Sequence, residues 1–142
     1  MHNRRNAFTL VELVVVIMIL GILAAVAAPK LLKTSQTATD NGLRQTLSIV
    51  RDAIELYAAE NGGSLPPCAD ATTSLQTALK PYIRGAFPKS PVGMKNQDVK
   101  ADGADPLGAD NTITGWMYNT STGEFICNSS ATSGDGTTYE TF

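Results

Sequence analysis

The sequence predicts an α+β fold in which a long N-terminal helix, whose first half spans a membrane, packs through its second half on a small antiparallel β-sheet. Three stretches of the chain carry this prediction. Residues 8–28 form an apolar run with a single charge, residues 43–57 place apolar side chains at helical spacing, and residues 115–128 have the pattern of a β-hairpin.

The apolar run of residues 8–28 is long enough to cross a membrane. As a helix, its 21 residues extend about 31 Å, close to the hydrocarbon thickness of a bilayer. At about −0.4 kcal/mol for each Val, Ile, Leu and Phe side chain, insertion is favoured by about 5 kcal/mol, whereas one acid costs up to about 3 kcal/mol. We therefore expect the segment to lie in membrane lipid despite Glu12. An acid kept inside such a span indicates a functional site and a partner for the carboxylate.

Small side chains gather on one side of this segment. At positions i, i+3, i+4 and i+7 they are Gly21, Ala24, Ala25 and Ala28. Two small-xxx-small pairs result, which let helix backbones approach closely, although glycine and alanine are also common in membrane helices generally. Pro29 follows, and because it has no backbone N–H we expect it to kink or loosen the helix where the helix continues.

The helix is predicted to continue to about Glu60. Apolar residues recur at spacings of 4, 3, 4 and 3 along one face of an amphipathic helix, namely Leu43, Leu47, Val50, Ile54 and Tyr57. Ile49, Ala53 and Leu56 widen that face, and Asn61-Gly62-Gly63 supplies a C-terminal stop. A sheet or further helices must cover such a face.

Beyond the helix we expect short elements separated by turns. They are a helix at Ser74–Tyr82, a proline-rich turn at Phe87–Gly93 and the hairpin at Gly115–Asn128. In the hairpin, Trp116 shares a strand face with Tyr118, and Phe125 shares one with Cys127. Such aromatic side chains more often pack in a core against a helix than stack on a ligand. The tail, residues 129–142, is rich in Ser, Thr and Gly and is expected to be a loose end or an irregular edge.

Cys68 and Cys127 are the two cysteines of the chain. In an exported domain they could form one disulfide, which would close a loop of about 60 residues and stabilise the fold by about 4 kcal/mol. The alternative is two separate thiols in the core.

The loop-like stretch of residues 96–111 carries closely spaced acids. They are Asp98, Asp102, Asp105 and Asp110. Their oxygens are weak calcium candidates, because the spacing matches no EF-hand pattern and an acidic, solvated loop is the commoner case.

The composition excludes several function classes. The net charge is −2, and no basic cluster interleaves with aromatic residues, so nucleic acid is not an expected partner. The one histidine, His2, precedes the apolar run, which excludes His-dependent catalysis and His-based metal sites from the rest of the chain. Since no nucleophile–base pair, phosphate-binding loop or metal cluster stands out, we expect neither an enzyme nor a cofactor.

The N-terminal residues resemble a known family. Met1–Ala7 is a short leader with two arginines, and Phe8-Thr9-Leu10-Val11-Glu12, the apolar run and Pro29 follow it. This order of features resembles the cleavage and methylation motif of type IV pilins and type II secretion pseudopilins. The resemblance implies that a prepilin peptidase cuts between Ala7 and Phe8 and methylates the new amine of Phe8. Ala7 stands where the family normally has glycine, so cutting is expected to be slower.

The family resemblance implies three parts and a pilin-like fold. They are a leader (1–7), a transmembrane and assembly segment (8–28), and a soluble domain (29–142) that begins with the amphipathic helix to about residue 61. The mature protein would cross the bacterial inner membrane once, with its C-terminal domain in the periplasm, before it joins a helical filament of identical copies, periplasmic or extracellular. The implied partners are the prepilin peptidase, membrane lipid, an inner-membrane assembly platform and minor pilins. The residues expected to act in assembly are Glu12, Gly21, Ala24, Ala25, Ala28 and Pro29.

The expected role of Glu12 follows from the cost of burying a lone carboxylate in lipid. Cutting before Phe8 creates an ammonium four residues from Glu12, and this ammonium could be neutralised in its own helix or by Glu12 of a neighbouring copy. Our hypothesis is that the intermolecular pair sets the axial register of the filament.

Within the family, the turn at Phe87–Gly93 is similar to the segment before the sheet in major pseudopilins, with Val92 where tryptophan is usual. We therefore favour a pseudopilin that polymerises to drive type II protein secretion, with a type IV pilus subunit for adhesion or motility as the alternative.

Two rival interpretations of the chain lie outside this family. Arg4-Arg5, the apolar region and Ala25-Val26-Ala27 make a passable signal peptide with cleavage after Ala27, but Glu12 argues against it. A membrane-tethered enzyme or binding module is the second rival. The mass of the mature protein separates a loss of seven residues and a gain of one methyl group from a loss of 27 residues.

Overall fold

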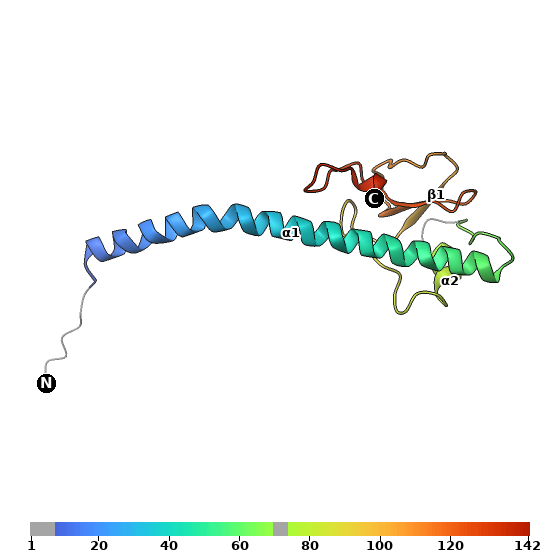
Figure 1. The fold of residues 1–142 in the computed structure, drawn as a ribbon, viewed down its shortest axis with the longest axis horizontal. Coiled ribbons are helices and arrows are strands. Elements are labelled where there is room, and N and C mark those ends of the chain that lie inside the picture. The colour runs from blue at the N-terminus through green and yellow to red at the C-terminus, as the bar shows by residue number, and fades with distance from the viewer. Residues whose placement is uncertain (1–7, 70–73) are drawn as a thin grey trace, which may run out of the picture. The chain divides into compact units, whose positions relative to one another are not determined.

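The structure, a computed structural model, describes residues 8–69 and 74–142. Its elements in chain order are α1 (Leu10–Glu60), α2 (Ser74–Leu79), β1 (Val99–Asp102), β2 (Trp116–Asn119), β3 (Phe125–Cys127) and the short 3₁₀-helix η1 (Tyr139–Thr141) (Figure 1). The α+β class is confirmed. The chain divides into two compact units, one up to Ser35 and one from Gln36 to Phe142, and each is described by itself.

In the first unit, α1 runs without interruption through Pro29. From Phe8 to Leu32, its large apolar side chains are 44–84% exposed, and they occur on every side of the helix. These side chains can stay out of water only in another apolar medium.

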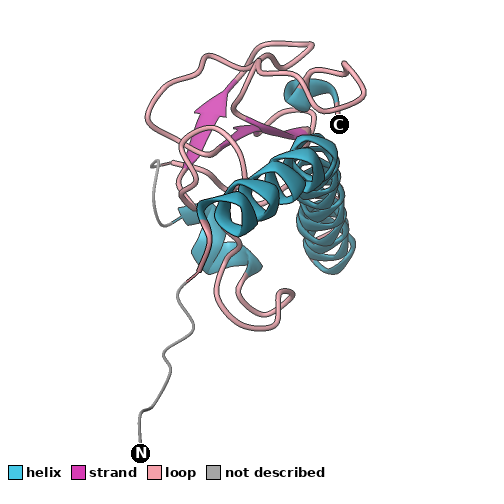
Figure 2. Cartoon of the chain, turned by 90° about the vertical axis from the view of Figure 1, so that its left-hand side faces the viewer, coloured by secondary structure: helices cyan, strands magenta, loops and turns pink. Residues whose placement is uncertain are grey.

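In the second unit, α1 buries one stripe of side chains. Its members are Leu43, Leu47, Val50, Ala53 and Ile54, each at most 3% exposed, and Tyr57 packs against them. The stripe is narrower than the sequence predicts, because Ile49 and Leu56 remain 46% and 54% exposed. A three-stranded sheet is too small to cover the full width of the helix, and Figure 2 shows the strands on one side of α1.

The sheet has the order β1-β2-β3 and is mixed. Strands β2 and β3 form the predicted antiparallel hairpin, with Trp116 opposite Cys127 and Tyr118 opposite Phe125. The prediction of a purely antiparallel sheet is wrong, because β1 pairs with β2 in parallel, from Val99 opposite Trp116 to Asp102 opposite Asn119. Strand β1 lies in the stretch predicted as loop.

The aromatic side chains of the hairpin belong to the core. Trp116, Tyr118 and Phe125 are completely buried in the cluster that includes the α1 stripe. Their polar atoms have partners: Trp116 Nε1–H donates to the Pro88 carbonyl at 3.0 Å, and the Tyr118 hydroxyl donates to the Pro66 carbonyl at 3.2 Å. Ligand stacking on these rings is excluded by their burial.

The opposite face of the hairpin has its own small cluster. Met117 and Ile126 point away from α1 and pack with Leu107, which the loop after β1 supplies. Both faces of the hairpin are therefore covered, which accounts for strands that are buried at every position.

The tail is anchored to α1, which corrects the prediction of a loose end. Asp40 of α1 accepts a 2.8 Å hydrogen bond from the Tyr139 hydroxyl and a 3.1 Å bond from the Gly134 N–H. Arg51 donates through Nε and Nη2 to the Phe125 carbonyl, at 3.0 and 2.9 Å, and through Nη2 to the Phe142 carbonyl at 2.6 Å. Two polar side chains of the helix thus hold both β3 and the tail.

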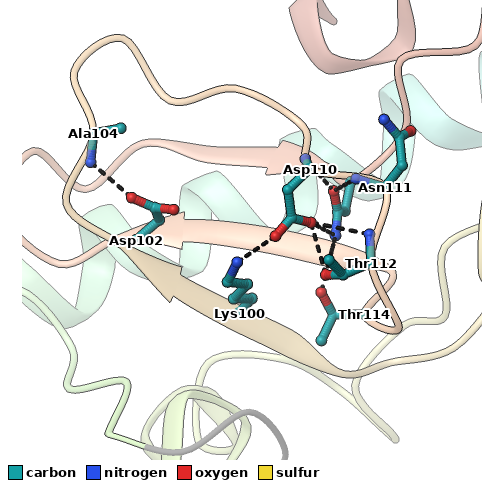
Figure 3. Close-up of polar contacts among 8 residues, drawn as sticks. Lys100, Asp102, Ala104, Asp110, Asn111, Thr112 and Thr114 are labelled. Atoms are coloured by element: carbon teal, nitrogen blue, oxygen red, sulfur yellow. Dashed lines mark hydrogen bonds and ion pairs between the residues drawn. The ribbon is translucent and has the colours of Figure 1, made fainter.

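The loop between β1 and β2 is held by a network around Asp110 (Figure 3). Lys100 of β1 pairs with Asp110 Oδ2, while Asp110 Oδ1 accepts bonds from Thr112 and from Asn128 Nδ2. Asn128 Oδ1 in turn accepts bonds of 2.9 Å from the N–H groups of Asp110 and Asn111. These bonds connect the loop to the residue directly after β3.

The predicted disulfide is not present. Cys68 and Cys127 are both buried, and the structure contains them as thiols. Cys127 Sγ instead lies 3.5 Å from Ser90 Oγ in the core, and burial raises the pKa of the Cys127 thiol, which keeps it protonated at neutral pH.

The anchor of the tail can be tested by mutation. Tyr139→Phe removes the hydroxyl that donates to Asp40 and leaves a buried carboxylate short of one donor. We expect a loss of about 1–2 kcal/mol in the free energy of unfolding, measured with the full chain in detergent. Tyr82→Phe is the matched control, because its hydroxyl contacts Glu60 at an exposed position; an equal effect of both substitutions would contradict the assignment.

Acid should weaken the domain partly through Asp110. Desolvation favours its protonated form, but bonds from Lys100, Thr112 and Asn128 outweigh this and hold the pKa of Asp110 well below its usual range. A carboxyl whose pKa falls on folding stabilises the folded state above its unfolded pKa, about 3.9, and that contribution is lost as the pH falls toward the folded pKa. We expect the Tm to drop below about pH 4, and Asp110→Asn to make that drop shallower. Asp105→Asn, on the same exposed loop, should leave its steepness unchanged.

Candidate functional site

The candidate site is the N-terminal end of α1, where an acid stands among apolar residues. Thr9 precedes the first helical residue, and its carbonyl accepts the 3.3 Å bond from the Leu13 N–H that begins the helix. The Thr9 N–H and hydroxyl donate to Glu12 Oε2 at 2.9 and 2.8 Å, and Thr9 Oγ accepts from the Glu12 N–H at 3.2 Å. This reciprocal arrangement is a capping box.

The capping box decides where the Glu12 carboxylate points. Both bonds from Thr9 fall on Oε2, so the group is turned back toward the helix N-terminus and toward Phe8, where the helix dipole also favours a negative charge. Within residues 8–69 and 74–142, no ammonium or guanidinium pairs with Glu12. The carboxylate is therefore partly satisfied and still able to accept a cation at the N-terminal end.

Thr9 is a functional candidate that the sequence analysis missed. The spacing Thr-x-x-Glu directly before an apolar run is the sequence signature of a capping box, and this signal was present. The expected cut site itself, Ala7–Phe8, lies at the edge of the structure, since Ala7 is outside the described residues and Phe8 is 84% exposed.

The small residues of the predicted assembly face lie on the uninterrupted helix. A Cβ placed on Gly21 would meet no atom within 4 Å, and Ala24, Ala25 and Ala28 are exposed. Among residues 8–69 and 74–142, none therefore covers this face. Among the described residues, α1 is the one helix that is long and apolar enough to cross a membrane, judged by length and composition alone.

The acids proposed for calcium do not converge in the part of the chain that the structure describes. No group of three or more His, Cys, Asp or Glu side chains there is arranged to hold a metal ion. Asp110 pairs with Lys100, whereas Asp102 points to the Ala104 N–H, which donates to it at 3.0 Å (Figure 3). Asp98 and Asp105 belong to no such metal-binding group either.

A hollow of about 240 Å³ lies between α2 and the segment from Ile83 to Phe87. Lys80 is the one ionisable side chain among its lining residues, which are otherwise apolar or uncharged. It offers neither a nucleophile with an adjacent base nor paired carboxylates, so its residues do not form an arrangement that would catalyse a reaction.

Known proteins match this chain at its N-terminal end and beyond it. Residues 2–28 match the family described as "Prokaryotic N-terminal methylation motif". "Prepilin peptidase-dependent protein D" of Escherichia coli is 31% identical over 126 residues, which cover 82% of this chain and 84% of that protein.

Two shorter matches point in the same direction. "Competence protein ComGC" of Halalkalibacterium halodurans is 36% identical over 69 residues, which cover 49% of this chain and 67% of that protein. "Type IV narrow pilus major component PilA5" of Thermus thermophilus is 35% identical over 65 residues, which cover 46% of this chain and 55% of that protein. No solved structure matches the chain. The motif at the start of α1, the apolar helix with its small mixed sheet, and a relative matched over most of its length together place this chain in the type IV pilin and pseudopilin family.

Proposed function

We propose that this protein is the subunit of a pilus-like filament, that a prepilin peptidase cuts it between Ala7 and Phe8, and that the amine of Phe8 is then methylated. The observation that carries the proposal is the position of Glu12. A carboxylate turned toward the N-terminal end stands within an apolar helix whose large side chains remain exposed in the described structure. The family match to residues 2–28 supports the cutting and methylation steps.

The chemistry of assembly follows from the capping box. Cutting before Phe8 produces an ammonium at the end of the chain to which the Glu12 carboxylate is turned. A second copy can bring its own ammonium to Glu12 in a medium of low dielectric, where a paired charge is far less costly than a lone one. The uncut chain has no amine at that depth, so it remains a monomer. The pair thus links proteolysis to polymerisation.

Close packing of the helices completes the assembly step. Transfer of α1 from lipid into a bundle of helices gains little hydrophobic free energy, because both surroundings are apolar. Association therefore depends on contact between backbones at Gly21 and the exposed alanines, Ala24, Ala25 and Ala28, together with the Glu12 pair. Pro29, which removes one backbone donor, allows the helix to open locally as the bundle forms.

The protein is proposed to cross the bacterial inner membrane once through residues 8–28, with the unit from Gln36 to Phe142 in the periplasm. The short basic leader on the cytoplasmic side supports this orientation. An assembly platform and minor pilins in the same membrane would then add each copy to the filament.

Two kinds of filament fit this subunit. The turn at Phe87–Gly93 favours a pseudopilin of type II secretion, whereas the similarity to a narrow pilus component of Thermus thermophilus favours a type IV pilus. Deletion of the gene separates them, since the first filament is needed to release secreted proteins and the second appears as fibres on the cell surface.

The mature N-terminus is the first test. We expect mass spectrometry of the protein from its own membranes to show loss of residues 1–7 and addition of one methyl group at Phe8. A chain that begins at Ala28 would instead identify a secreted protein with a signal peptide, and an unmodified Phe8 would contradict the methylation step.

Charge at Glu12 is the second test. Glu12→Gln keeps the size of the side chain and one oxygen that can accept both bonds from Thr9, but it removes the charge. We therefore expect normal insertion and cutting, with at least about a tenfold loss of filaments in electron micrographs. Thr9→Ala should produce a smaller loss, because it frees the carboxylate without removing it. Glu60→Gln, an exposed acid at the other end of α1, is the control and should assemble normally. Normal filaments from Glu12→Gln would refute the pairing.

A further inference from the structure

The second unit of the chain leaves one face of α1 uncovered, which we call the outer stripe: Ile49, Asp52, Glu55 and Leu56. Ile49 and Leu56 are 46% and 54% exposed and stand seven residues apart, or two helical turns. Asp52, also exposed, lies between them on the same side of the helix. Large apolar side chains around a carboxylate suit a partner that is both apolar and basic.

The acids of this region have no cationic partner in the part of the chain that the structure describes. Asp52 has one contact, at 3.5 Å, with the Ser48 hydroxyl, and no hydrogen bond or ion pair involves Glu55. Both acids line a hollow of about 400 Å³ along α1, which has room for a long side chain from outside.

The arginines that line the same hollow do not neutralise these acids, because the tail holds them. Arg44 lies 3.7 Å from the centre of the Phe142 ring and 3.5 Å from Asp135. Arg51 donates to the carbonyls of Phe125 and Phe142. The carboxylates beside them therefore remain available for a cation that another molecule supplies.

The first unit of the same chain carries a surface that complements the outer stripe. Lys30 and Lys33 are exposed and three residues apart, as Asp52 and Glu55 are. Val26, 72% exposed, precedes Lys30 by one turn, much as Ile49 precedes Asp52. The two pairs of charges have the same spacing and opposite sign, and an apolar residue precedes them by four residues in one surface and by three in the other.

We infer that in the filament the outer stripe of one copy binds the segment around Lys30 of a second copy, with Lys30 opposite Asp52 and Lys33 opposite Glu55. This inference rests on the proposed function, which makes neighbouring helices parallel because every copy enters from the same membrane. One stagger satisfies both pairs, since 52 − 30 and 55 − 33 are both 22 residues, or about 33 Å of helix. The same stagger brings Val26 within one residue of the level of Ile49.

These pairs fix the position of one copy along its neighbour more than they add affinity. A single exposed ion pair contributes little, about 0–1 kcal/mol, but a shift by one helical turn would move both lysines away from both acids. The Glu12 pair allows a copy to join the bundle, and the outer stripe then sets the axial position of that copy relative to its neighbour.

Cross-linking between copies tests the inferred stagger. We would combine Lys30→Cys with Asp52→Cys in the full chain, assemble filaments in a bacterium that processes them, and add a short bismaleimide. The native thiols, Cys68 and Cys127, are buried and should react slowly. We expect a ladder of covalent multimers, and a loss of at least about tenfold in its yield for the control that combines Lys30→Cys with Glu60→Cys, eight residues or about 12 Å away.

Exchange of charges tests whether the ion pairs cause the stagger. Asp52→Lys with Glu55→Lys should reduce filaments about tenfold through like-charge repulsion, while cutting and methylation stay normal. Adding Lys30→Glu and Lys33→Glu to the same chain should restore the filaments, because every copy then carries the exchanged pair.

The outcomes separate this inference from the function on which it rests. Normal filaments without a ladder would overturn the stagger and leave the filament proposal intact. The lysine changes alone could also reduce the filaments. If exchange of the acids did not then restore them, the lysines would bind lipid phosphate instead, and the inference would be overturned. Absence of any filament from the unaltered, methylated chain would overturn both proposals.

Discussion

The apolar surface of α1 in the first unit governs the behaviour of the whole protein. Side chains from Phe8 to Leu32 remain 44–84% exposed, and water cannot be their permanent surroundings. Lipid or other copies of the same helix must cover them. Under the proposed function Glu12 makes those two environments differ strongly, because lipid would offer its carboxylate no cation and a neighbouring cut chain would offer an ammonium.

The second unit uses the continuation of the same helix for a different purpose. There α1 buries one stripe, from Leu43 to Ile54, beneath a hairpin whose aromatic rings are completely covered. Polar side chains at the edge of that stripe then fasten the rest of the chain, since Asp40 holds the tail and Arg51 holds both β3 and Phe142. The helix is thus the support for the small domain, and the outer stripe is the part of it that the domain leaves uncovered.

Local patterns in the sequence were sufficient for the helix and the hairpin, and insufficient for contacts between distant residues. Strand β1 escaped prediction because Val99 is its one buried side chain, so its pairing with β2 leaves no alternation to detect. The tail was missed because the bonds that anchor it join residues far apart in the sequence, such as Tyr139 and Asp40, which are 99 positions apart. Ile49 and Leu56 were placed in the core because periodicity does not show how wide the sheet is. At the site, Glu12 stood out as an acid in an apolar run, whereas its orientation by Thr9 needed the structure.

The parallel pairing of β1 and β2 has a consequence for how such proteins can vary. The chain must return from the end of one strand to the start of the next, so residues 103–115 cross the sheet outside the helix surface. Only Leu107 of this crossing enters a core cluster, and residues 103–106 are exposed. Composition can change at residues 103–106 while α1, the hairpin and the network around Asp110 stay the same, which makes this part of the crossing a suitable place for an inserted epitope tag.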